Sequence, residues 1–189
     1  MPRHISGTDS DNRRTGPLHV AWITGPLGDL LAAGRGGRLV RLLFADSLAN
    51  RRKAALQEAL GSEYECADLP VLQLIASELD AYFSGTLRRF RTRVSFSGTP
   101  FQIRTWEELC RIPHGSTISY SELAARVGRP RACRAVAQAN GANCLPIIVP
   151  CHRVINKDGG LGGFSAGLEK KEWLLAHEKA MAERRGRPR

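Results

Sequence analysis

Two short helices joined by a glycine turn are predicted by residues 118–141, which read ISYSELAARVGRPRACRAVAQANG. Ser119 can cap the first helix, and Glu122 three residues later gives the pattern of a capping box. Gly128 ends this helix, and a first-turn proline opens the second, which we expect at about 130–139. Such a pair is typical of a helix-turn-helix.

The second predicted helix has one polar side. Four residues share that side by their three- and four-residue spacing: Arg131, Arg134, Ala135 and Gln138. The other residues are mainly Ala, Cys and Val, so the helix can approach another surface closely. Two interpretations stay open, a DNA-contacting helix and an ordinary packing helix of small residues.

The charge of the chain favours a polyanionic partner. Lys and Arg number 28 against 18 Asp and Glu, a net charge of +10. No acidic residue lies between Glu122 and Asp158, a stretch that holds six Arg and Lys. A one-signed stretch inside a folded segment suggests nucleic acid as the partner. A solvated basic face is the simpler alternative.

The first half of the chain has the signature of a β-meander followed by helices. The expected strands are Leu18–Ile23, Leu30–Ala33, Leu39–Ala45 and Phe90–Phe96, and the expected helices are Asn50–Leu60 and Pro70–Phe83. The breaker cluster Ser97–Pro100 marks a domain boundary.

We therefore predict an α/β N-terminal domain and a mainly α C-terminal domain with a helix-turn-helix. The predicted divisions are a flexible leader (1–16), the N-terminal domain (17–97), the C-terminal DNA-binding domain (98–183) and a basic tail (184–189). No apolar run reaches the roughly 20 residues of a membrane span, and the leader lacks a signal-peptide pattern. The five cysteines fit no disulfide framework, so we expect free thiols and a cytoplasmic location.

Pro150–Val154, with the sequence PCHRV, carries the strongest chemical signal. A thiolate is the nucleophilic form of cysteine, and a neighbouring imidazolium lowers the thiol pKa. Adjacent strand residues point to opposite sides, so Cys151 and His152 can couple only in a turn or through a water. A buried inert thiol is the alternative. The Gly-rich loop 158–165 follows and ends in Phe164 and Ser165, an aromatic ring and a hydroxyl that could hold a flat heterocycle.

The stretch from Phe101 to Glu178 resembles the C-terminal domain of the O6-alkylguanine-DNA alkyltransferases. The resemblance rests on short motifs in the same order and at compatible spacing. They are Ile112–Gly115, Ile118–Tyr120, Arg134–Val136, Ala139–Gly141 with Asn143, Pro150–Val154, Gly167–Leu168, Glu172–Leu175 and His177–Glu178.

The resemblance implies a catalytic role for five of these residues. Cys151 would accept the alkyl group, His152 would act through a water as its base, and Glu178 would orient His152. Asn143 would brace the turn before the acceptor. Tyr120 would push on the phosphate of the target nucleotide and assist the leaving guanine.

The resemblance also implies how DNA is bound. Arg134 would fill the space left by the flipped base, with Arg131, Ala135 and Ser121 beside it on the DNA. The Val154 carbonyl and the Ser165 hydroxyl would read the guanine edge, with Phe164 as a wall. The partner would be double-stranded DNA with alkylated guanine, possibly also O4-alkylthymine, and the protein a monomer that works once, without cofactor or metal.

Some positions depart from the family pattern. Ala137, Cys144, Phe164 and Ala166 replace the usual Gly, Pro, Tyr and Gly. The zinc of some relatives is doubtful, because the first half offers only Cys66, His4 and His19. A DNA-sensing module and a cysteine hydrolase are the rival functions.

The last helix predicts a buried glutamate. One side of this helix holds, by three- and four-residue spacing, Lys171, Leu174, Leu175 and Glu178, and the two leucines should face the core. A buried carboxylate is costly unless it is paired, and His152 is the partner that the resemblance supplies. The alternative is a surface glutamate at a fraying helix end.

Overall fold

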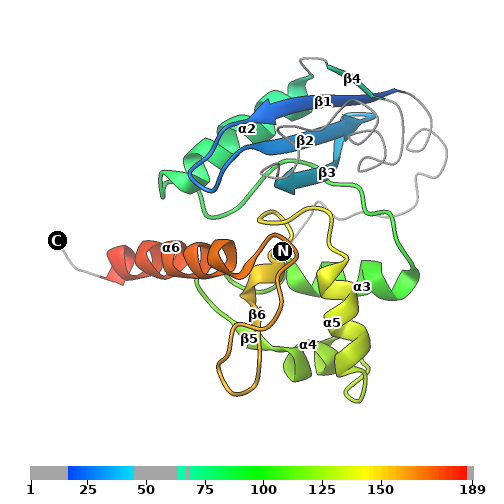
Figure 1. Ribbon diagram of the computed structural model, residues 1–189, viewed down its shortest axis with the longest axis vertical. Coiled ribbons are helices and arrows are strands. Elements are labelled where there is room, and N and C mark those ends of the chain that lie inside the picture. Colours follow the sequence, from blue (N-terminus) through cyan, green and yellow to red (C-terminus); the bar gives the residue numbers. More distant parts are fainter. Residues whose placement is uncertain (1–16, 45–63, 67–68, 187–189) are drawn as a thin grey trace. The chain divides into compact units, whose positions relative to one another are not determined.

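The computed structural model describes residues 17–44, 64–66 and 69–186 and divides the chain into two compact units, residues 1–96 and 97–189 (Figure 1). The predicted leader and the predicted helix Asn50–Leu60 lie outside the described residues. Among the described residues, no helix combines the length and apolar character needed to cross a membrane.

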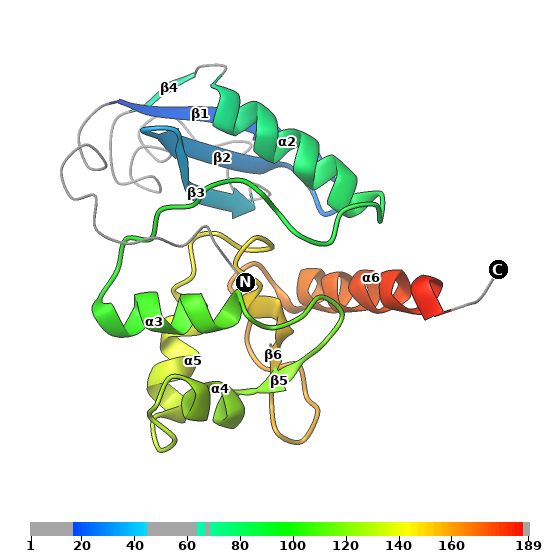
Figure 2. The same ribbon diagram turned by 180° about the vertical axis from the view of Figure 1, so that it is seen from behind.

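The described residues of the first unit form a four-stranded sheet covered by one helix. Its elements are β1 (Leu18–Ile23), β2 (Leu30–Arg35), β3 (Arg38–Phe44), β4 (Tyr64–Cys66) and α2 (Pro70–Phe83). The strand order is β3-β2-β1-β4, antiparallel between β1, β2 and β3 and parallel between β1 and β4. Helix α2 lies across one face of the sheet, behind it in Figure 1 and in front of it in Figure 2.

Close packing of α2 on the sheet follows from the sequence. Leu72, Ile75 and Leu79 form a buried stripe at three- and four-residue steps, and each such side chain stabilises the fold by about 1.5–3 kcal/mol. Gly34 of β2 lies under this helix, and a Cβ there would come within 3.0 Å of Val71. Glycine therefore permits the close approach.

The predicted strand Phe90–Phe96 is wrong. Only one bridge forms, between Leu39 and Val94. The physical reason is the buried carboxylate of Glu78, which accepts hydrogen bonds from the amides of Arg91 (2.6 Å) and Thr92 (3.0 Å). Backbone donors held by a side chain cannot extend a ladder.

The second unit is mainly helical and contains the predicted helix-turn-helix. Its elements are α3 (Pro100–Leu109), β5 (Ile118–Ser119), α4 (Tyr120–Arg126), α5 (Cys133–Gly141), η1 (Cys151–Arg153), β6 (Val154–Ile155) and α6 (Leu168–Gly186). The fold class predicted from the sequence is confirmed. Residues 184–186 of the predicted tail are helical, as part of α6.

The helix-turn-helix differs from its prediction in two details. Ser119 caps α4 by accepting from the Glu122 amide (3.1 Å), but the Glu122 carboxylate bonds Arg126 (2.6 Å), which leaves half a capping box. Helix α5 begins at Cys133 rather than Pro130, because residues 129–132 form a turn after the left-handed Gly128 (φ +76°). Arg131 therefore precedes the helix and does not share its face.

Candidate active site

A tight turn at η1 presents Cys151 and His152. The segment before it is braced by Asn143, whose Nδ2 donates to the Val149 carbonyl (2.8 Å) and whose Oδ1 accepts from the Leu145 amide (3.0 Å). Ile147 is buried and has a positive φ of 73°, which is strained for a β-branched residue. The surrounding bonds thus hold a conformation that the local sequence disfavours.

Cys151 is buried, and its sulfur has a hydrogen-bond donor. Asn143 Nδ2 lies 3.1 Å from Sγ. Burial raises the pKa of Cys151, while the bond from Asn143 and the charge of Lys171 work in the opposite direction. Because the net shift is upward, the resting group is a thiol, and a base must remove its proton before it attacks.

His152 is completely buried and faces a carboxylate. Its Nε2 lies 3.0 Å from Glu178 Oε1, while Nδ1 has no hydrogen-bond partner among the described residues. Burial lowers the pKa of His152 although Glu178 opposes the shift. The ring is therefore neutral at pH 7, the protonation state that a base requires. With the proton assigned to Nε2 by the Glu178 contact, Nδ1 is a basic atom.

Glu178 is buried, as expected from the helix pattern, and is shared between several donors. Besides His152 it accepts from Arg153, by Nε (2.9 Å) and Nη2 (2.8 Å), and from the amide of Gly115 (3.0 Å). Burial alone would raise the pKa of Glu178, but the bonds from His152 and Arg153 lower it below its usual range. The carboxylate is thus charged throughout the physiological range.

Arg153 was not among the predicted site residues. It is buried, and its Nη1 also donates to the Ile112 carbonyl, 41 residues away (2.7 Å). A buried carboxylate needs a cation beside it, and Glu178 was expected to be buried. This rule could have pointed to Arg153, the residue next to the predicted partner His152.

Lys171 is a second residue that the site prediction missed. It is fully buried in α6, and its ammonium group donates to the carbonyls of Val154 (2.6 Å), Gly163 (3.4 Å) and Leu161. Burial lowers the pKa of Lys171 to about 8, while the charge on Cys151 raises it. Lys171 therefore fastens the Gly-rich loop to β6 and places a positive group near the thiol.

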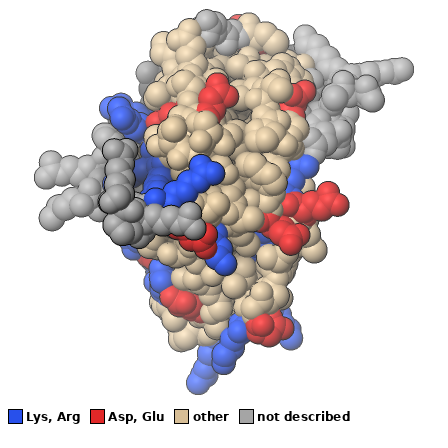
Figure 3. Space-filling view, turned by 90° about the vertical axis from the view of Figure 1, so that its left-hand side faces the viewer, with Lys and Arg blue, Asp and Glu red and all other residues tan. Residues whose placement is uncertain are grey.

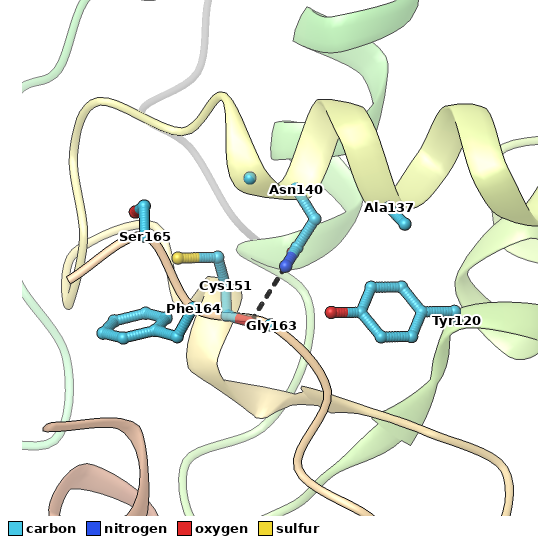
Figure 4. Close-up of a pocket in the computed structure, with 8 residues that line it drawn as sticks. Tyr120, Ala137, Asn140, Cys151, Gly163, Phe164 and Ser165 are labelled. Carbon is cyan, nitrogen blue, oxygen red and sulfur yellow. Dashed lines mark hydrogen bonds between the residues drawn. The ribbon is translucent and has the colours of Figure 1, made fainter. Parts of the chain in front are cut away.

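A cavity of about 370 Å³ opens beside the thiol. Its lining consists of Tyr120, Ala137, Asn140, Gly141, Cys151, Gly163, Phe164 and Ser165. In Figure 4, Phe164 and Ser165 flank Cys151 and the Tyr120 hydroxyl points into the same space. The structure thus brings four predicted residues together here.

Near the thiol also lie Asn140, which is part of the lining, and Val154, which is not. Asn140, not predicted as a site residue, donates through Nδ2 to the Cys151 carbonyl (3.3 Å; Figure 4). Val154, predicted to read the base with its carbonyl, is buried outside the lining, and that carbonyl accepts from Lys171. Burial raises the pKa of Tyr120, so its phenol is neutral at pH 7.

The predicted DNA-binding residues lie on the helix-turn-helix and are all exposed. Arg134 and Ala135 are in the first turn of α5, and Arg131 is in the turn before it. Ser121 is the second residue of α4, and its hydroxyl lies 2.8 Å from that of Ser119. Figure 3 shows both Lys and Arg (blue) and Asp and Glu (red) side chains on the surface.

The part of the chain that is described offers no cluster of three or more His, Cys, Asp or Glu side chains suited to a metal ion. Cys66 is exposed at the end of β4. His4 lies outside the described residues.

Comparison with known proteins gives matches over both units. Residues 18–96 match the family model for the 6-O-methylguanine DNA methyltransferase, ribonuclease-like domain, and residues 100–180 match that for its DNA binding domain. The methylated-DNA–protein-cysteine methyltransferase of Mycobacterium leprae is 40% identical over 162 residues, covering 86% of this chain and 93% of the relative. That of Methanosarcina mazei is 41% identical over 83% of this chain and 94% of the relative.

Solved structures are similar over the same range. A crystal structure of Mycobacterium tuberculosis OGT in complex with DNA is 38% identical, with a TM-score of 0.75 over 86% of this chain and 94% of its own. The O6-methylguanine-DNA methyltransferase of Pyrococcus kodakaraensis is 31% identical, with a TM-score of 0.59 over 85% and 98% of the two chains.

Proposed function

The chain belongs to the methylated-DNA–protein-cysteine methyltransferase family and repairs DNA by direct alkyl transfer; on this premise we propose that Cys151 is the acceptor and O6-alkylguanine the substrate. The observation that carries the proposal is the position of the Cys151 thiol. It lines the cavity, receives a hydrogen bond from Asn143 and adjoins the pair His152–Glu178.

The first chemical step is deprotonation of the thiol. His152 takes the proton of Cys151 on Nδ1 through one water, and Glu178 stabilises the imidazolium that forms. The Asn143 amide and the buried charge of Lys171 stabilise the thiolate. These groups partly offset the rise in the pKa of Cys151 that its burial causes.

The transfer itself is an in-line displacement. The thiolate forms a bond to the alkyl carbon as the bond from that carbon to O6 breaks, and the bonding electrons leave with the guanine. The neutral phenol of Tyr120 supplies a proton to the leaving base and recovers one from solvent. Overall the alkyl group replaces the thiol proton, and guanine gains one proton. The thioether is stable, so each molecule acts once.

The base has to leave the helix stack before it can reach a buried thiol. Extrusion costs a few kcal/mol, and Arg134 at the start of α5 would fill the gap. Phe164 and Ser165 would hold the extruded guanine against Cys151, and the Val154 carbonyl would read its edge with the lone pair that Lys171 does not use. Arg131, Ala135 and Ser121 would hold the surrounding DNA.

Replacing the acceptor tests the proposal. Cys151→Ala should abolish transfer from a methylated duplex and keep its affinity for DNA, since no exposed basic residue changes. The matched control is Cys144→Ala, a half-buried cysteine that should keep transfer. Full transfer by Cys151→Ala would refute the assignment.

A second experiment tests extrusion. Arg134→Ala should slow repair of duplex DNA more than reaction with the free alkylguanine base, which needs no extrusion. Arg111→Ala, exposed at the end of α3, serves as the control. Equal losses on both substrates would remove Arg134 from base flipping.

We further propose that the protein is a monomer and that it is located in the cytoplasm. The five free cysteines support the location, because thiols stay reduced there. Light scattering of the purified chain at micromolar concentration tests the monomer. A mass of two chains would contradict it.

A further inference from the structure

A strip of arginines lies on the first unit, outside residues 100–180 matched by the DNA binding domain. No acidic residue occurs between Asp80 and Glu107, although this stretch holds five arginines. Four of them are exposed, and three of these four, Arg89, Arg91 and Arg93, belong to the first unit; we call these three the arginine strip.

The strip is held by a rigid scaffold. Between Arg91 and Arg93, Thr92 is buried and its hydroxyl donates to Glu78 (2.7 Å). The amide of Leu39 in β3 donates to the Arg93 carbonyl (2.8 Å), and that of Ser95 donates back to the Leu39 carbonyl (2.9 Å). Hydrogen bonds to Glu78 and to Leu39 thus hold the backbone of the segment that carries the guanidinium groups.

The guanidinium groups of the arginine strip carry charges that no described carboxylate neutralises. Within the described ranges, no carboxylate forms an ion pair with Arg89, Arg91 or Arg93. Glu78, the acidic side chain under the segment, is buried and bonds only backbone amides and a hydroxyl there. Unpaired guanidinium groups on a fixed backbone suit a partner with regularly placed anionic oxygens.

We infer that the arginine strip binds the phosphate backbone of nucleic acid, as a second contact surface besides the helix-turn-helix. Guanidinium groups match phosphate oxygens in pairs, and the protein already works on DNA. A membrane surface fits less well, because the large exposed apolar residues, Trp22, Leu74 and Leu168, lie elsewhere in the described sequence. Phe90, the aromatic residue within the segment, packs against Tyr82 with ring centroids 5.5 Å apart.

The test removes the three charges and measures the salt dependence of binding to an undamaged duplex. Each lost phosphate contact lowers the slope of log K against log salt by about 0.9. The triple variant Arg89→Gln, Arg91→Gln, Arg93→Gln should therefore lose roughly 2–3 in slope and bind about a hundredfold more weakly at 0.15 M salt. The corresponding Arg→Lys triple should keep most of the slope.

The control triple Arg104→Gln, Lys179→Gln, Arg184→Gln removes the same charge from exposed positions on α3 and α6. Transfer from the free alkylguanine base should be unchanged in both glutamine triples, which separates this inference from the assignment of Cys151. An unchanged slope, or an equal fall in the control, would overturn the inference. So would weaker binding to phosphatidylserine vesicles with DNA binding unaltered.

Discussion

Within the part of the chain that the structure describes, each unit buries one glutamate, and the two glutamates are held by different kinds of donor. Glu78 in the first unit accepts from two backbone amides and a hydroxyl, all neutral groups. Glu178 in the second unit accepts from Arg153, His152 and one amide. Neutral donors are enough to fix a loop, whereas Glu178 belongs to a network that can move a proton.

The contrast extends to the surroundings. In the first unit, one hydrophobic cluster consists of buried aliphatic residues of β1 and β2, such as Leu18, Val20 and Leu31. The second unit buries Arg153 and Lys171 beside its histidine and its thiol. Burying charge costs several kcal/mol per ion unless it is paired, so this network stabilises the fold less than an apolar core would. The chemistry that we propose for Cys151 would account for the presence of this network.

Removing Glu178 should have the largest effect. Glu178→Ala leaves Arg153 as an unpaired buried cation, which we expect to cost about 3–5 kcal/mol in the free energy of unfolding and to abolish transfer. Urea unfolding and single-turnover transfer are the measurements. Glu172→Ala, exposed on the same helix, should leave both unchanged. A fully active, stable Glu178→Ala protein would show that the network is dispensable.

The same carboxylate should govern acid stability. Because its pKa is lowered in the folded state, its contribution is complete above the unfolded pKa of about 4.3 and is lost as the pH falls toward the folded value. Wild-type unfolding free energy should therefore fall steeply below about pH 5. In the isosteric Glu178→Gln this loss should be smaller. Parallel curves for the two proteins would contradict the assignment.

Lys171→Met should have an intermediate effect. The thiolate loses a positive neighbour, the Gly-rich loop loses two hydrogen bonds and β6 loses one. We expect transfer to slow about tenfold, the equivalent of one pKa unit of thiolate stabilisation. Alkylation of Cys151 by iodoacetamide as a function of pH checks the cause, and its midpoint should move to higher pH. An unmoved midpoint would limit Lys171 to holding the loop.

Lys171 also gives a stability signature in alkali. Its pKa of about 8 lies below the usual 10.5, so between these values the unfolded chain binds the extra proton. This group therefore makes the wild-type free energy of unfolding rise with pH across that window. The rise should be absent in Lys171→Met.

Glu78→Gln should have the smallest effect on function. The amide keeps one acceptor for the Arg91–Thr92 segment, so we expect a loss of about 1–3 kcal/mol in the free energy of unfolding. Transfer from the free base should not change. Slower transfer in this variant would contradict the assignment of a purely structural role to Glu78. The exposed Glu65→Gln is the control.

The fold class and the burial of Glu178 followed from the sequence because they depend on spacing. Helical periodicity placed Glu178 on the buried side of α6, and the family resemblance supplied His152 as its partner. Arg153 and Lys171 escaped prediction because their partners include distant carbonyls, such as that of Ile112, which no local pattern indicates.

The errors in secondary structure have the same origin. Glu78 took the amides that residues 90–96 needed for a strand, from 13 and 14 positions away. The start of α5 moved to Cys133 because the turn after Gly128 uses the residues that a first-turn proline would have placed in the helix. In both cases a tertiary or turn contact outweighed a correct local preference.

Mapping the alkyl group on the wild-type protein tests the central claim most directly. The protein is incubated with a duplex containing O6-methylguanine, digested, and its cysteine peptides are analysed by mass spectrometry. The account predicts one methyl group on Cys151 at one equivalent per chain, and none on Cys66, Cys110, Cys133 or Cys144. A methyl group on any of those four, with Cys151 unmodified, would contradict it.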